Sequence, residues 1–169
     1  MSEKTALERN APDPKELANF GWMEAWLGRG AEPTPAGFRW LQQSGFKTVV
    51  NLRAEDDSEA YLDVALKMKH VLIPVADNQA PSDAQVLTWL QLCADPMNRP
   101  VFVHCESGHG RTSTFSILVR LAQGVRLRPA IDEQVKHYGF DPKHDRAQIA
   151  YLESVRARLK DGELKLPPL

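Results

Sequence analysis

The sequence predicts an α/β domain with a mostly parallel central sheet flanked by helices. Short apolar and β-branched runs, at 48–52, 71–73 and 101–103, have the length and composition of buried strands. Segments with helical periodicity separate these runs, and strands that alternate with helices are typical of a parallel sheet. Such sheets carry their sites at the carboxyl ends of the strands, so the residues after each run are the first candidates for chemistry.

The composition is that of one ordinary globular domain. The chain has 169 residues, of which 43% are hydrophobic and 25% charged, enough to build a core without disulfides. Its net charge of −1 argues against general binding to nucleic acid or to an anionic membrane. With only two cysteines, no apolar signal segment and no stretch long enough to cross a bilayer, the sequence predicts a cytoplasmic protein.

We expect three regions along the chain. Residues 1–18 are polar and contain two prolines, which favours a loose N-terminal arm. Residues 19–160 hold the predicted elements and form a single domain. Residues 161–169 are expected to form a C-terminal tail that frays.

Local signals place the remaining elements. The aromatic stretch 19–30 predicts one or two short strands, and Thr34 before Pro35 predicts the start of a helix. Ser82 with Gln85 forms a capping-box pattern at the start of another. Helices are also expected at about 58–68, 111–122, 129–138 and 145–160.

The three principal strand ends carry Arg53, Asp77 and Cys105, and the last of these opens the most informative segment, His104 to Thr112. This segment runs from a predicted strand into a predicted helix, which turns its amides toward a common centre beside the positive helix terminus. Its glycines permit a tight loop. We expect the loop to bind a phosphate dianion, through Glu106, Ser107, Gly108, His109, Gly110 and Arg111.

Two side chains of this loop have complementary chemistry. The planar guanidinium of Arg111 can bind two phosphate oxygens at once. The same positive field stabilises a thiolate on Cys105, which is the nucleophilic form of cysteine. The loop is therefore expected to hold a phosphate ester and to attack it.

The pattern His-Cys-x5-Arg-Thr resembles the signature of the protein tyrosine phosphatase superfamily, and residues 19–155 resemble its compact dual-specificity branch. The resemblance implies the fold of that family and a phosphocysteine intermediate, with no metal or organic cofactor. It also implies supporting roles for His104, which orients the loop, and Thr112, whose hydroxyl lies near the sulfur. One departure is Ser113, where the family usually has glycine.

A general acid must protonate the leaving oxygen. Asp77 lies just past a strand end, and its position and spacing to the cysteine are similar to those of the family's acid loop. Asp83 is the alternative, although a carboxylate in the first turn of a helix is also explained by the helix dipole. Asp95 precedes a proline and is expected to be a turn residue.

The remaining candidates have structural explanations of equal or greater weight. Arg53 either adds positive charge to the pocket rim or forms a structural ion pair, and Arg29 is expected to tie down the fold. Cys93 lies on an apolar helix face and is expected in the core, with a disulfide to Cys105 as the minor alternative.

The sequence narrows the substrate only to a class. Larger tyrosine-specific relatives have a tyrosine-containing loop that deepens the pocket, and this chain shows no equivalent. The resemblance therefore favours a shallower site, open to phosphotyrosine or phosphoserine/threonine in a phosphorylated protein, or to a small-molecule phosphate ester. The loop also resembles that of phosphatase-like phytases, which act on inositol polyphosphates, but their Trp-Pro-Asp acid loop is absent. A third hypothesis is an inactive phosphate-binding module, against which the intact Cys105 and Arg111 argue.

Overall fold

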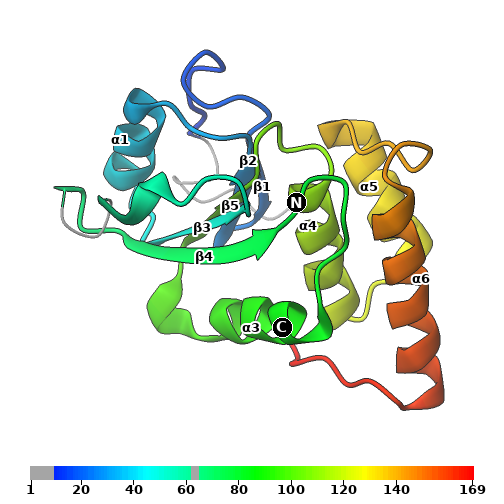
Figure 1. The fold of residues 1–169 in the computed structure, drawn as a ribbon. Coiled ribbons are helices and arrows are strands. Elements are labelled where there is room, and N and C mark those ends of the chain that lie inside the picture. Colours follow the sequence, from blue (N-terminus) through cyan, green and yellow to red (C-terminus); the bar gives the residue numbers. More distant parts are fainter. Residues whose placement is uncertain (1–9, 62–64) are drawn as a thin grey trace.

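A five-stranded sheet forms the centre of the molecule (Figure 1). The computed structural model describes residues 10–61 and 65–169. Within them β1 and β2 are antiparallel, whereas β2, β5, β3 and β4 are parallel neighbours in that order. The predicted α/β class with a mostly parallel sheet is confirmed. The strands are β1 Gly21–Glu24, β2 Leu27–Gly30, β3 Thr48–Arg53, β4 Lys69–Val75 and β5 Val101–His104.

Helices cover both faces of this sheet because its strands alternate their side chains. Val49 and Phe102 point to one face, where they pack with helix α1 and Leu17 of the N-terminal segment. Val50 and Val103 point to the other face and join the larger core beneath the remaining helices. The helices are α1 Pro35–Gln43, α3 Asp83–Ala94, α4 Arg111–Ala122, α5 Leu127–Tyr138 and α6 Arg146–Asp161.

The local capping signals act as expected. The Thr34 hydroxyl accepts a hydrogen bond from the Gly37 amide at 3.2 Å, and Pro35 opens α1. Ser82 and Gln85 form the complete capping box at the start of α3, with reciprocal hydrogen bonds of 3.2 and 3.0 Å. These contacts fix the start of α3 and therefore the length of the loop that joins it to β4.

One expectation about the less regular segments was wrong, and two others extend beyond the described residues. Of the helix expected at 58–68, the structure describes a short 3-10 turn, Ser58–Tyr61, and residues 62–64 lie outside the described part. The C-terminal tail does not fray, because three leucines pack against the larger core as the tail returns toward α3 (Figure 1): Leu164, Leu166 and Leu169. Residues 1–9 of the expected N-terminal arm also lie outside the described residues.

The part of the chain that the structure describes holds no helix long and apolar enough to cross a bilayer.

A polar link joins α3 to α6 at the surface. Arg158 donates hydrogen bonds of 2.6 and 3.0 Å to the Asp83 carboxylate, and the Tyr151 hydroxyl donates another of 2.7 Å. These hydrogen bonds lower the pKa of Asp83, because they favour its ionised form. Asp83 therefore acts as a structural carboxylate between two helices.

We expect Asp83→Asn to lower the free energy of unfolding near neutral pH by up to about 1 kcal/mol, the range of exposed ion pairs. Because folding lowers the pKa of this carboxyl, its contribution is complete above the unfolded pKa, at about pH 4, and is lost as the pH falls through the folded value. Urea unfolding at pH 7 and at successively lower pH measures the difference. A double-mutant cycle with Arg158→Gln is the control, and fully additive effects of the two changes would contradict the link.

Candidate active site

Cys105 follows the last residue of β5 and opens the loop that ends at the first turn of α4. Its side chain is 2% exposed, and the Thr112 hydroxyl donates a hydrogen bond to Sγ at 3.0 Å. The loop thus places one sulfur atom, with a dedicated donor, at the amino end of a helix.

The loop lies directly on the backbone of β2, and this contact requires glycine. Gly108 has a φ of +77°, and a Cβ atom there would lie 2.9 Å from the carbonyl group of Gly30. A larger residue would be strained both by its backbone angle and by this clash. The close contact holds the middle of the loop against the sheet.

A buried arginine reinforces the same contact. Arg29 is fully buried and donates to the carbonyl oxygen of Gly108, to Gln134 Oε1 at 2.8 Å and to Ser113 Oγ at 3.3 Å. Its guanidinium also lies 4.0 Å from the centre of the Tyr138 ring. Burial lowers the pKa of Arg29 to about 10, so it remains a cation at neutral pH. Ser113, the departure from the family pattern, is therefore a hydrogen-bond acceptor for the arginine that supports the loop.

His104 is also buried, and it links the loop to a network of ion pairs. Its Nδ1 lies 2.9 Å from the Cys105 carbonyl oxygen, which can only accept, and its Nε2 lies 2.9 Å from Glu59. Glu59, itself 2% exposed, accepts from Arg53 at 3.2 Å. The supporting position expected for His104 is thus present in the geometry, while Glu59 was not foreseen.

Arg53 forms structural ion pairs instead of lining the pocket rim. Its side chain is 4% exposed, and besides Glu59 it contacts Glu32 at 2.7 Å and Asp56 at 3.3 Å. Its charge is therefore compensated by three carboxylates. Of the two explanations weighed for this residue, the structure supports the ion pair.

Arg111, the first residue of α4, is held along one edge of its guanidinium. Nη1 donates to both oxygens of Glu55, at 2.6 and 2.9 Å, and to the carbonyl oxygen of Val75 at 2.9 Å. Nη2 has only a long contact of 3.7 Å with Asp77, and the buried Nε has no hydrogen-bond partner. The Nε and Nη2 edge therefore retains two donors for an anion, the pair that a bidentate phosphate contact needs. Glu55 was also not foreseen as a site residue.

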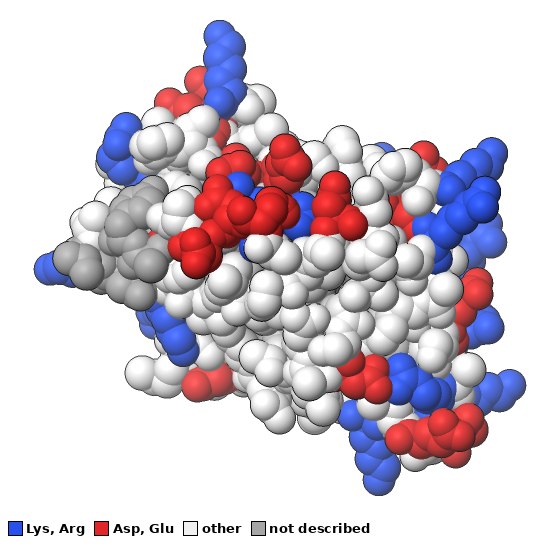
Figure 2. Space-filling view, viewed as in Figure 1, with Lys and Arg blue, Asp and Glu red and all other residues white. Residues whose placement is uncertain are grey.

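Among the three candidate acids, only Asp77 lies beside the loop. Its side chain is 66% exposed and shares a hollow with Glu55 and Glu106. Asp83 is bound to Arg158 on α6, and Asp95 accepts from the amide of Met97 as a turn residue. Figure 2 shows Asp and Glu side chains gathered around partly covered basic groups on the face where β4 ends, whereas other Lys and Arg side chains lie toward the periphery.

The second cysteine is remote from this chemistry. Cys93 lies in α3 within the larger core, and both cysteines are free thiols. Burial raises the pKa of Cys93, which keeps it protonated and unreactive. Its expected place in the core is confirmed.

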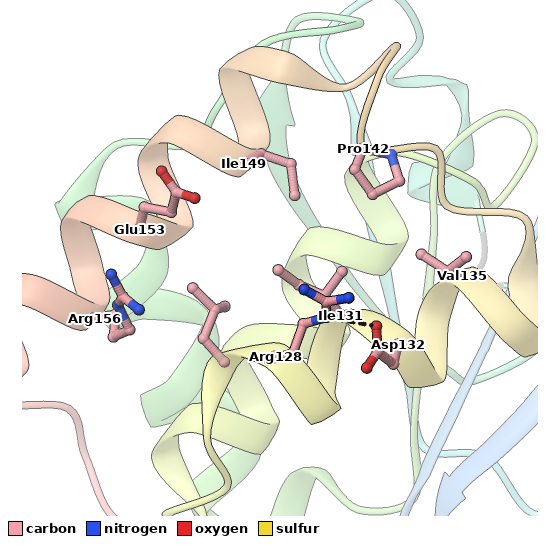
Figure 3. A pocket seen from close by; sticks show the side chains of 9 residues that line it. Arg128, Ile131, Asp132, Val135, Pro142, Ile149, Glu153 and Arg156 are labelled. Atoms are coloured by element: carbon pink, nitrogen blue, oxygen red, sulfur yellow. Dashed lines mark hydrogen bonds and ion pairs between the residues drawn. The ribbon is translucent and has the colours of Figure 1, made fainter.

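Another hollow lies between α5 and α6 (Figure 3). Apolar side chains such as Ile131 and Ile149 form its floor, and charged residues such as Arg156 and Glu153 stand at its edges. It contains none of the predicted site residues. Across residues 10–61 and 65–169, no group of three or more His, Cys, Asp or Glu side chains is arranged to hold a metal ion.

Comparison with known proteins agrees with this geometry. A family model described as "DSP-PTPase phosphatase fused to NAD+ Kinase" matches residues 13–150. The chloroplastic NAD kinase 2 of Arabidopsis thaliana is 37% identical over 92 residues, which are 50% of this chain and 9% of that protein. The chain therefore spans only a small part of the length of such kinases.

Similarity to a phosphatase of comparable size extends over most of the chain. The dual specificity protein phosphatase TpbA of Pseudomonas aeruginosa is 32% identical over 161 residues, covering 90% of this chain and 71% of TpbA. Its crystal structure aligns with a TM-score of 0.69 at 33% identity, over 85% of this chain and 88% of that one. The catalytic core of Siw14 shares the fold, with a TM-score of 0.69 at 20% identity over 88% and 95% of the two chains. By its family match and its likeness to TpbA, the chain belongs to the dual-specificity branch of the protein tyrosine phosphatases.

Proposed function

We propose that this protein is a cysteine-dependent phosphatase that hydrolyses phosphate monoesters through a phosphocysteine intermediate. One observation carries the proposal: Cys105 Sγ, with its donor Thr112, shares a loop with Arg111, whose Nε is buried without a partner. A phosphate bound to the loop amides and to the free edge of Arg111 would satisfy that atom. It would also lie next to the sulfur.

In the first step, the Cys105 thiolate attacks phosphorus and forms an S–P bond while the ester P–O bond breaks. The leaving oxygen takes a proton from Asp77, which stands at the mouth of the loop. The amides of residues 106–111 and the Arg111 guanidinium bind the three equatorial oxygens, where negative charge gathers in the transition state. His104 keeps the Cys105 carbonyl turned away from the phosphate, through its hydrogen bond to that oxygen.

In the second step, water attacks the phosphocysteine and gives a proton to Asp77. The S–P bond breaks, inorganic phosphate leaves and the thiolate is restored. The Thr112 hydroxyl stabilises the departing sulfur through its hydrogen bond. Asp77 is again protonated, so the cycle needs no other proton source.

The relatives support a protein or peptide substrate. TpbA is named a dual specificity protein phosphatase, and one of its structures holds pTyr. A phosphotyrosine or phosphoserine/threonine side chain is therefore the first substrate to test. Siw14 is described as a PP-IP phosphatase, but its 20% identity supports only a common fold. A cytoplasmic location remains part of the proposal.

We expect Cys105→Ser to abolish turnover of p-nitrophenyl phosphate while vanadate still binds. The serine hydroxyl is a far weaker nucleophile at neutral pH, but the amide cradle is unchanged. Steady-state kinetics and vanadate titration measure the two properties. Substantial turnover by the variant would remove Cys105 from the mechanism, and equal binding with no turnover in the native protein would indicate an inactive phosphate-binding module.

Arg111→Lys should lower kcat by roughly 10²–10³, the cost of losing a preorganised transition-state donor. Lysine keeps the charge but cannot present two parallel donors, and it also loses the fork held by Glu55 and Val75. The measurement is kcat with an aryl phosphate, at saturating substrate. Arg128→Lys, on an exposed helix surface, is the matched control. A kcat near that of the native protein would contradict bidentate binding.

Asp77→Asn should lower the rate by roughly 10²–10⁴ and remove the descending limb of the pH–rate profile. The loss should be greatest for alkyl phosphates, whose leaving oxygen needs a proton, and smallest for activated aryl esters. Asp83→Asn is the matched control, since Asp83 is bound to Arg158, and it should leave the profile unchanged. Equal slowing of all esters by Asp77→Asn, with the basic limb retained, would make Asp77 a structural residue.

A further inference from the structure

The mouth of the phosphate-binding loop is surrounded by negative charge. The hollow beside the loop is lined by Ala54, Ala76 and three carboxylates, from Glu55, Asp77 and Glu106. These acidic groups come from three separate segments, which follow β3, β4 and β5. Glu55 and Glu106 add negative charge beside the loop, whereas Asp77 carries the proton that the proposed chemistry transfers.

Two further carboxylates extend this ring. Glu32 and Asp56 flank the buried Arg53, and their side chains are 42% and 36% exposed. Arg53 is also paired with the buried Glu59, so these groups together leave an excess of negative charge. We call Glu32, Glu55, Asp56 and Glu106 the carboxylate rim, which is part of the acidic cluster in Figure 2.

The hollow on the opposite side of the loop is also lined by acidic side chains, together with two histidines. The hollow there is lined by Asp77, Asp141 and Asp145, with His109 and His144. Within the described chain, neither this hollow nor the one beside Glu106 is lined by a lysine or arginine. A second phosphate on the substrate would therefore face Glu55 and Glu106 on one side of the loop and Asp141 on the other.

The positive charge that is present serves one phosphate. Arg111, at the end of the phosphate-binding loop, is 2% exposed and its Nη1 is held by Glu55. Its buried Nε has no hydrogen-bond partner. The unpartnered Nε points to an anionic ligand independently of the rim. One bound phosphate group uses this donor, Nη2 and the loop amides, which leaves the rim without cationic groups for any additional anion.

From this charge arrangement we infer that the site selects a single phosphate monoester flanked by positive charge. The substrate class is a phosphopeptide with lysine or arginine beside the phosphorylated residue. Polyphosphorylated small molecules are rejected. Glu106 and Glu32 determine this selectivity, because their carboxylates stand at the rim and the proposed chemistry assigns neither of them a proton to transfer. The inference rests on the proposed phosphatase function.

The physical basis is Coulombic and depends on salt. A cation on the peptide at about 5 Å from a rim carboxylate is attracted, and an anion there is repelled, with partial screening by water. The Debye length is about 8 Å at physiological ionic strength, so the effect weakens strongly as salt rises. Charges that steer a substrate to a cleft act mainly on kcat/KM.

The test compares two phosphotyrosine peptides that differ only at the four positions flanking the tyrosine, lysine in one and glutamate in the other. At 20 mM salt we expect kcat/KM of the lysine peptide to exceed that of the glutamate peptide by at least about tenfold. At 500 mM salt the ratio should fall toward one. Inositol hexakisphosphate should be a poorer substrate than either peptide.

Single substitutions assign the preference to the rim. Glu106→Gln and Glu32→Gln should each lower the peptide ratio by roughly two- to fivefold, the usual worth of one exposed charge pair. Glu153→Gln removes the same charge at the distant hollow between α5 and α6 and should leave the ratio unchanged. Turnover of p-nitrophenyl phosphate, which has no flanking charge, reports whether each variant retains a working site.

The outcomes separate the two proposals. If p-nitrophenyl phosphate and the peptides are hydrolysed but the peptide ratio is near one, or responds equally to Glu153→Gln and Glu106→Gln, the selectivity is overturned and the phosphatase function stands. Preferential hydrolysis of inositol hexakisphosphate would overturn it in the same way. If no ester is hydrolysed by the native protein, the proposed function and the selectivity fail together.

Discussion

The candidate site depends on the close contact between the loop that joins Cys105 to Arg111 and strand β2. Gly108 can approach the Gly30 backbone because it lacks a Cβ atom, and Arg29 then donates to its carbonyl oxygen from beneath. This contact fixes the middle of the loop between two ends that are already fixed, Cys105 by β5 and Arg111 by α4. With three points held, the loop backbone keeps one conformation without any ligand, and electrostatic catalysis requires such preorganisation.

Charged groups hold this arrangement from inside the protein, where their desolvation is costly. Arg29, Arg53, Glu59 and His104 are all buried, and each has at least one charged or strongly polar partner. Buried ion pairs contribute little net stability compared with well-packed apolar residues, but breaking one leaves an uncompensated charge. Their effect here is therefore to define one geometry: alternative positions of the loop would leave these groups without partners.

Much of the fold and of the loop could be predicted from the sequence because the signals for them lie in short stretches of consecutive residues. Strands, helix starts and the span His104 to Thr112 are local patterns, read within about ten residues of chain. Glu55 and Glu59 could not be found in this way, because their partners Arg111 and His104 lie 56 and 45 residues away. The sequence shows acidic residues soon after the end of a strand, but only the order of the strands in the sheet brings them next to the loop. The tail was mispredicted for a related reason, since its proline-rich end suggests fraying whereas its leucines meet a core formed by remote helices.

Distant contacts also set how the site can change over evolutionary time. The Val75 carbonyl, two residues before Asp77, accepts from the same Nη1 that Glu55 holds, so the start of the segment that carries Asp77 is fastened to Arg111. An insertion or shift at the end of β4 would displace that guanidinium as well. We therefore expect sequence changes at the end of β4 and at the start of α4 to occur together during evolution.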